Sequence, residues 1–204
     1  MYTLKEYKRA CKNLQLDTKE IKVALLGDTA TQFLATSIKG EGLLRGYNVN
    51  LFEAEYNQVE RQVMDLTSDL YKFGADYTVV FQSTHKLLEK YSILESAKQV
   101  LLAEERLDFI RLLCEQVKGR NYPEIDDTVF GSYASKVQNS FTYQLAKLNF
   151  ELMNLSQQYH NLFLCDLAGV SAKKGRDMMF DSSVYVNTEM ILSLDALPYV
   201  ASRT

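Results

Sequence analysis

The chain has 204 residues, of which 47% are hydrophobic and 24% are charged, and its formal net charge is −3. This length and apolar content suffice for one full core, and lysine and arginine are dispersed among acidic residues, which argues against nucleic-acid binding. Three cysteines without metal-ligand spacing, a charged N-terminal stretch and no apolar run of membrane length lead us to expect a cytoplasmic protein without a metal site or a membrane partner.

The first predicted elements are an amphipathic helix and a buried strand. Residues 3–16 place apolar side chains at spacings of three and four, which predicts a short helix that lies against the sheet. Residues 22–27 are predicted to form a strand, because the apolar run 23–26 leads into the turn at Asp28 and Thr29, and helix-compatible residues follow. In open α/β sheets, such strand-to-helix turns hold ligands at backbone N–H groups. We therefore expect the functional site at this turn.

The chain then alternates helices with strands. We expect the helix after the turn to be interrupted by Gly40 and Gly42 and to end at Gly46. Residues 48–52 alternate apolar and polar side chains, which predicts a second strand. Residues 77–81, with the sequence YTVVF, suit a central parallel strand that is buried on both faces.

The second half of the chain extends this pattern. It predicts helices over about 87–119 and 137–155, a last helix over 188–202, and short fourth and fifth strands at 128–131 and 161–166. Alternating strands and helices imply right-handed crossovers and a parallel sheet between two helical layers. We therefore predict an α/β fold with three α/β/α layers and a flavodoxin-like parallel sheet of about five strands.

The turn after the first strand resembles a motif of a known hydrolase family. Gly27, Asp28 and Thr29 are similar to the Gly-Asp-Ser block of the SGNH (GDSL-like) hydrolases, in which the serine is the nucleophile. The resemblance places Thr29 at the nucleophile position, while capping of the next helix is the structural alternative. The family's base comes from an Asp-x-x-His motif, but glutamine stands three residues before both His85 and His160. His85, which follows the third predicted strand, is the histidine placed to act on Thr29.

Two further blocks of that family are altered or incomplete. The Gly-x-Asn block falls at Gln82 and Ser83, where the amide can donate a hydrogen bond but the glycine is missing. Asn57 lies where the second block would contribute. The triad of nucleophile, base and orienting group is not met, so we expect weak or no hydrolase activity. The candidate catalytic residues are Thr29 and His85, and the candidate substrate-binding residues are Asp28, Asn57, Gln82 and Ser83.

A longer resemblance covers most of residues 20–203. Residues 25–34, 52–65, 75–81 and 176–185 look like the N-terminal domain of FkbH-like proteins, in order and spacing. In that family an SGNH-like domain precedes a phosphatase domain of the haloacid dehalogenase (HAD) superfamily, subfamily IIIC. Members of this type load a glyceryl unit from a phosphorylated glycerate onto an acyl carrier protein. The resemblance implies this chemistry for the parent protein.

The resemblance also implies a domain organisation. Residues 1–20 would form an N-terminal helix on an SGNH-like domain of residues 21–204, which would be the N-terminal part of a longer protein. The sequence has no strand that ends in the Asp-x-Asp motif of the phosphatase. Mg²⁺ is therefore expected only in the HAD domain, and no cofactor is expected in this one. The C-terminal HAD phosphatase-like domain and an acyl carrier protein are the implied partners.

Three hypotheses for the function remain open at this point. The first is a non-catalytic, degenerate SGNH-like domain that binds a substrate or a carrier. The second is an active esterase or acyltransferase in which Thr29 is the nucleophile and His85 is the base. The third is a dimerisation or docking platform with the N-terminal helix as its contact, which would make the protein a homodimer.

Overall fold

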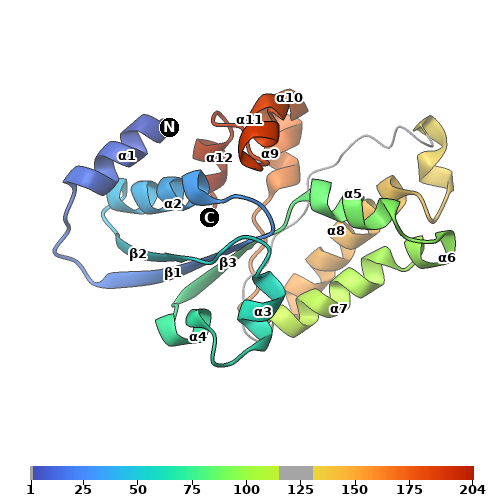
Figure 1. Ribbon diagram of the computed structural model, residues 1–204, viewed down its shortest axis with the longest axis horizontal. Coiled ribbons are helices and arrows are strands. Elements are labelled where there is room, and N and C mark those ends of the chain that lie inside the picture. Colours follow the sequence, from blue (N-terminus) through green and yellow to red (C-terminus); the bar gives the residue numbers. More distant parts are fainter. Residues whose placement is uncertain (1, 115–130) are drawn as a thin grey trace. The chain divides into compact units, whose positions relative to one another are not determined.

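Short helices and a small parallel sheet form the part of the chain that the structure describes. The structure is a computed structural model, and it describes residues 2–114 and 131–204. The chain separates into two units, Met1–Phe81 with Gly169–Thr204, and Gln82–Ala168. In chain order (Figure 1) the elements are α1 (Leu4–Asn13), β1 (Glu20–Gly27), α2 (Gln32–Leu44), β2 (Asn48–Glu53), α3 (Val59–Met64), α4 (Asp69–Phe73), β3 (Tyr77–Phe81), α5 (Thr84–Ser92), α6 (Ser96–Gln99), α7 (Leu102–Cys114), the 3₁₀ helix η1 (Gly131–Lys136), α8 (Phe141–Gln158), α9 (Leu167–Lys174), α10 (Arg176–Met179), α11 (Ser182–Thr188) and α12 (Leu197–Ala201).

The sheet lies in the first unit and has the strand order β2-β1-β3. The central strand β1 pairs in parallel with both neighbours, so that Leu25 lies opposite Glu53 and Gly27 lies opposite Phe81. Residues 24–26 have no exposed surface, as expected for an apolar run covered on both faces. The predicted α/β class and parallel sheet are confirmed. Residues 77–81 were expected to form a central strand buried on both faces, but β3 lies at one edge of the described sheet, and Tyr77 is 47% exposed. The carboxyl ends of the three strands meet at one edge, where the predicted turn lies.

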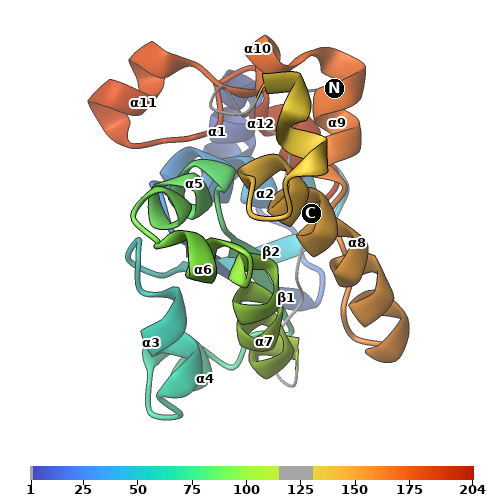
Figure 2. The ribbon, with the colours of Figure 1, turned by 90° about the vertical axis from the view of Figure 1, so that its right-hand side faces the viewer.

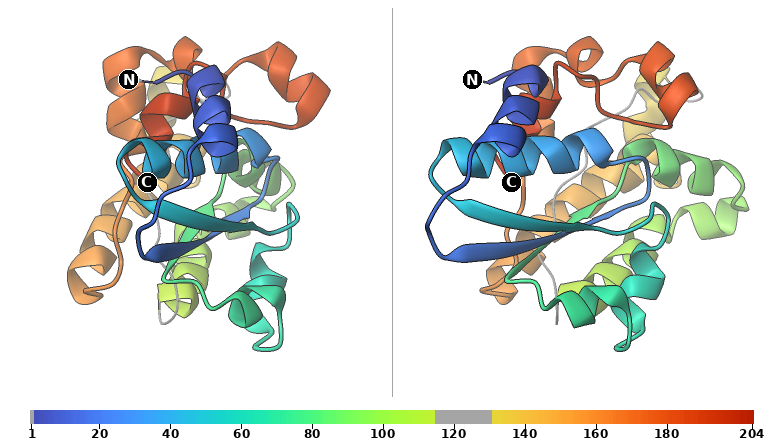
Figure 3. Two further views of the ribbon diagram at one scale, coloured as in Figure 1. Left: turned by 90° about the vertical axis from the view of Figure 1, so that its left-hand side faces the viewer. Right: turned by 60° about the vertical axis from the view of Figure 1, so that its left-hand side comes forward.

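Helices cover both faces of this sheet. Side chains alternate along a strand, so Val49 and Phe52 of β2 point to opposite faces. Val49 packs on α2 so closely that a Cβ atom on Gly42 would lie 2.4 Å from its Cγ2 atom. The Phe52 ring contacts Phe73 of α4, with centroids 5.5 Å apart. Figure 3 shows α2 and α4 on opposite sides of the strands.

The expected five strands are not observed, because the described residues contain a sheet of three strands. Residues 128–130 of the predicted fourth strand lie outside the described residues, and Gly131 begins η1. Residues 161–166, the predicted fifth strand, form no strand. Their alternating leucines, Leu162 and Leu164, pack on a cluster of helical side chains instead. The alternating pattern correctly indicated which side chains pack inward, but they pack on helices and not within a sheet.

Helix α1 packs on α2, and not on the sheet as predicted. The Tyr7 side chain is fully buried, and its hydroxyl donates a 2.7 Å hydrogen bond to the Glu41 carboxylate. Gly40 makes this approach possible, because a Cβ atom there would lie 2.5 Å from the Tyr7 Cβ atom. The prediction that Gly40 and Gly42 interrupt the helix is therefore wrong, since α2 continues through both and uses them for close packing. Figure 3 shows α1 lying over α2.

The second unit is helical (Figure 2), and a cluster of buried side chains forms its core. The predicted helix over 87–119 is divided into α5, α6 and α7, with its last five residues outside the described part. The predicted 137–155 helix is observed as α8. Gln144 is buried between these helices, where its Oε1 atom accepts a 3.0 Å hydrogen bond from the Ala103 N–H. The buried cluster consists of Leu87, Tyr91, Leu102, Ala103, Leu107, Ile110, Phe141, Leu145, Leu148, Leu152, Leu155 and Leu162.

The C-terminal segment returns to the first unit. The predicted 188–202 helix is shorter than expected, because α12 begins only at Leu197. Pro198 lies in its first turn, where the fixed φ of proline and its missing N–H suit a helix start. Among the described helices, none has both the length and the apolar character that a membrane span requires.

Candidate functional site

The turn after β1 is tightly constrained. The Asp28 N–H donates a 3.1 Å hydrogen bond to the Phe81 carbonyl, which joins the ends of β1 and β3. Gly27 has no room for a side chain, because a Cβ atom there would lie 2.5 Å from the Thr31 Cγ2 atom. The glycine is therefore required by close packing against Thr31. The tight turn that the sequence predicted at the carboxyl end of this strand is therefore confirmed.

Thr29 is fully buried in this turn. Its Oγ1 atom has no hydrogen-bond partner among the described residues. A nucleophile must meet its substrate and pass its proton to a base, and this hydroxyl is withdrawn from solvent and from any such contact. Helix capping does not explain it either, because the N-cap of α2 is Thr31.

A hydrogen bond between Thr31 and Glu53 connects the turn to the end of β2. Thr31 is 2% exposed, and its hydroxyl donates to Glu53 Oε1 at 2.6 Å. The carboxylate therefore lies at the N-terminal end of α2, where the helix dipole favours negative charge. Neither residue was predicted as part of the site. The available signal was that Glu53 directly follows the second predicted strand, at the same sheet edge as Thr31.

An open pocket of about 590 Å³ lies beside this hydrogen bond. Asn57, a predicted binding residue, lines it, whereas Asp28 and Thr29 do not. The Asn57 N–H donates a 2.9 Å hydrogen bond to the Gly27 carbonyl, and its φ of 61° is in the left-handed region that asparagine tolerates. This loop is thereby held against the end of β1. The pocket is lined by Thr31, Gln32, Glu53, Ala54, Glu55, Tyr56, Asn57 and Gln58.

Gln82 and Ser83 belong to the second unit and precede α5. Ser83 is the N-cap of α5, and its Oγ atom accepts a 3.0 Å hydrogen bond from the Lys86 N–H. This is an ordinary capping arrangement that satisfies one of the free N–H groups at a helix start. Ser83 is 3% exposed, and its hydroxyl oxygen caps the helix. Gln82 is half-buried directly before this cap.

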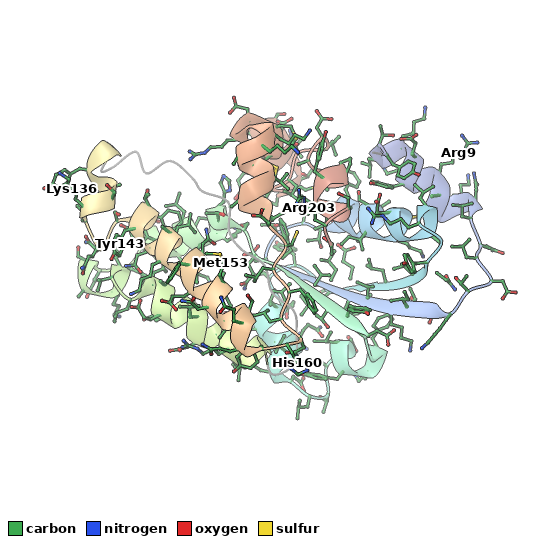
Figure 4. All side chains as sticks on the ribbon, turned by 180° about the vertical axis from the view of Figure 1, so that it is seen from behind. Arg9, Lys136, Tyr143, Met153, His160 and Arg203 are labelled. Carbon is green, nitrogen blue, oxygen red and sulfur yellow. The ribbon has the colours of Figure 1, made fainter. Side chains whose placement is uncertain are left out.

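His85 is half-buried in the first turn of α5. Burial lowers its pKa, and the Glu89 carboxylate acts in the opposite direction. The imidazole is therefore neutral at pH 7, as a general base must be. Thr29 belongs to the first unit and His85 to the second, and their pairing stays a prediction. Figure 4 shows the other histidine, His160, past the end of α8, where it is exposed.

Residues 2–114 and 131–204 contain no group of three or more histidine, cysteine, aspartate or glutamate side chains that could hold a metal ion. The Asp181 side chain has a structural role at the start of α11. Its carboxylate caps α11 by accepting hydrogen bonds from the Ser183 and Val184 N–H groups. The hydrogen bond from the Ser183 hydroxyl, together with these two backbone bonds, lowers the pKa of Asp181.

Comparison with known proteins gives one family and two similar structures. The family described as "FkbH, N-terminal domain" matches residues 22–204. The chain is 67% identical to the N-terminal part of the protein BF1531 from Bacteroides fragilis, described as containing a phosphatase domain complexed with Mg, with a TM-score of 0.97. The match covers 100% of this chain and 55% of that one, so this chain spans about half of its relative.

The second structure is more distant. It is an acetyl xylan esterase, AlAXEase, with 16% identity and a TM-score of 0.48, and the match covers 90% of this chain and 97% of the esterase. The comparison with curated proteins gives no match.

Proposed function

This chain belongs to the FkbH N-terminal domain family, and we propose that it is a binding module and not an active hydrolase. It is a degenerate SGNH-like domain that holds a substrate or a carrier for a phosphatase-like HAD domain in the same protein. The 67% identical relative supports this arrangement, since it contains a phosphatase domain and this chain covers 55% of it. The phosphatase chemistry and its Mg²⁺ belong to that second domain.

The burial of Thr29 is the observation that carries this proposal. The hydroxyl at the nucleophile position is fully buried and has no hydrogen-bond partner among the described residues. The sequence also lacks the Asp-x-x-His motif that would supply the base. A hydroxyl without a base is a weak nucleophile. The open pocket beside Thr31 remains accessible, which suits binding without chemistry.

Ester and thioester turnover tests the proposal directly. We expect the chain to hydrolyse p-nitrophenyl acetate and an acyl thioester at the same rate as its Thr29→Ala variant. Thr18→Ala is the matched control, because Thr18 is exposed in the segment before β1. A rate that falls at least tenfold in Thr29→Ala, but not in Thr18→Ala, would overturn the non-catalytic assignment.

The proposed carrier is an acyl carrier protein, whose surface is acidic. Lys173 and Lys174 end α9, and Arg176 begins α10, so three basic residues lie close together in an exposed segment. Opposite charges across an interface speed association and make it salt-dependent. We expect Lys173→Glu to weaken capture of an acyl carrier protein at low salt. Lys12→Glu, on the exposed side of α1, is the control and leaves capture unchanged.

An esterase or acyltransferase is the second candidate, and the neutral state of His85 favours it. Burial lowers the pKa of His85, so the imidazole can accept a proton at pH 7. In this candidate Thr29 attacks the acyl carbonyl after a rearrangement exposes its hydroxyl. Turnover would then be lost in both Thr29→Ala and His85→Ala. Equal turnover in the chain and in both variants would exclude this candidate.

A further inference from the structure

The pocket beside the Thr31–Glu53 hydrogen bond contains carboxylates and amides but no positive charge. Its lining includes Glu53 and Glu55 and has neither lysine nor arginine. Arg61, the nearest arginine along the chain, lies outside this lining and donates a 3.4 Å hydrogen bond to the Gln58 side chain. A phosphate or carboxylate placed in the pocket would meet two carboxylates, and no lysine or arginine of the lining would balance its charge.

The N-terminus of α2 does not make the pocket favourable for an anionic ligand. A helix N-terminus at the end of a strand ordinarily favours an anion. Here the Glu53 carboxylate, bonded at 2.6 Å to the hydroxyl of the N-cap Thr31, already lies at that end. The anion that the helix dipole favours is thus part of the protein. The neutral side chains of the lining and the second carboxylate oxygen of Glu53 therefore determine which ligand binds.

These groups suit a ring that bears several hydroxyl groups. Glu53 accepts the Thr31 bond through Oε1, which leaves Oε2 as an acceptor, and the Asn57 side-chain amide can both donate and accept. The Tyr56 side chain, 52% exposed, adds an aromatic surface to the lining. The face of an aromatic ring is weakly negative and suits the C–H face of a sugar ring.

We infer that this pocket binds a neutral pyranose sugar and excludes its phosphorylated or carboxylated forms. This inference rests on the proposed binding function and names the ligand class for it. The stated volume of about 590 Å³ lies within the range of small-molecule sites. The module therefore holds a neutral sugar group, while phosphate chemistry takes place in the HAD domain.

Backbone amide chemical shifts of the chain provide the test, with three hydroxylated probes that differ in charge and in the presence of a ring. Methyl β-D-glucopyranoside is the neutral ring, methyl β-D-glucuronide carries a carboxylate on the same ring, and glycerol has hydroxyl groups without a ring. We expect saturable shifts at residues 53–58 with the glucoside, and binding about tenfold weaker with the glucuronide because of charge repulsion. Glycerol is expected to cause no saturable shift.

Variants assign these preferences to residues. Tyr56→Ala is expected to weaken glucoside binding about fivefold through loss of the ring contact. Glu55→Gln is expected to bring glucuronide binding closer to that of the glucoside. Glu60→Gln is the matched control, because Glu60 is exposed on α3 and lies outside the lining. Glu55 and Tyr56 are also exposed, so both variants should fold normally.

Three results would overturn the inference: no glucoside shifts, equal binding of the glucuronide, or glycerol shifts at the same residues. The proposed function fails separately, through ester turnover that depends on Thr29. If the glucoside does not bind and turnover is unchanged in Thr29→Ala, the inference of a sugar ligand is wrong, while the proposed binding function still stands.

Discussion

The Thr31 hydroxyl donates a 2.6 Å hydrogen bond to Glu53, while the Thr29 hydroxyl, two residues earlier, has no partner among the described residues. Both threonines are buried, at 2% and 0% exposure. Their side chains therefore have opposite effects on folding. A buried hydroxyl stabilises the protein when it is hydrogen-bonded and destabilises it when it is not.

Thr31→Val is expected to lower the free energy of unfolding by about 1–3 kcal/mol, because the Glu53 carboxylate loses its donor. Urea denaturation followed by circular dichroism measures this change. Thr31→Ser keeps the hydroxyl and should lose less. Equal stability of Thr31→Val and the unmodified chain would show that the bond contributes nothing.

Thr29→Val is expected to raise the free energy of unfolding by about 1 kcal/mol, since valine has nearly the shape of threonine and removes an unsatisfied buried hydroxyl. The same urea experiment applies. Thr31→Val serves as the comparison, with a change of opposite sign. A loss of stability in Thr29→Val would mean that this hydroxyl has a stabilising interaction.

The buried Tyr7 links α1 to α2 in a pH-dependent way. Burial and the hydrogen bond to the Glu41 carboxylate raise the pKa of the Tyr7 hydroxyl. Its contribution is therefore complete below the ordinary tyrosine pKa of about 10 and is lost as pH rises through the higher folded-state pKa. We expect Tyr7→Phe to lower the free energy of unfolding by about 1–3 kcal/mol at pH 7.

The difference between Tyr7→Phe and the unmodified chain should shrink as pH rises above about 10. Denaturation at a series of alkaline pH values measures this. Tyr47→Phe is the control, because the Tyr47 side chain is 54% exposed and should show no such dependence. A difference that stays constant across this pH range would contradict the assignment.

His85 is expected to titrate below the ordinary histidine pKa of about 6.5, because burial disfavours its charged form. Its contribution to stability is present above that value and is lost as pH falls through the lower folded-state pKa. Imidazole ¹H NMR signals measure the titration. Glu89→Gln should lower the pKa of His85 further, since this carboxylate favours the charged form. A midpoint at or above about 6.5 would count against burial as the cause.

Local patterns in the sequence were sufficient to predict much of the framework. The apolar run at 23–26 and the YTVVF segment at 77–81 correspond to β1 and β3. The apolar pattern of β1 is that of a central parallel strand covered on both faces. The similar pattern at 77–81 predicted the strand but not its position, because β3 lies at one edge of the described sheet. The alternation at 161–166 was misleading, because it reveals that alternate residues are buried but not which element covers them. Here helices cover Leu162, and no strand forms.

The sequence by itself determined the α/β class, the position of the turn at Asp28 and Thr29, and the absence of an Asp-x-x-His motif. These are properties of neighbouring residues. The tertiary structure alone decided that Thr29 is buried without a partner and that Thr31 bonds to Glu53, 22 residues away. The register of β2 against β1 and the packing of α2 determine which side chains meet and which of the two buried hydroxyls is hydrogen-bonded. Those contacts are not encoded in any local spacing.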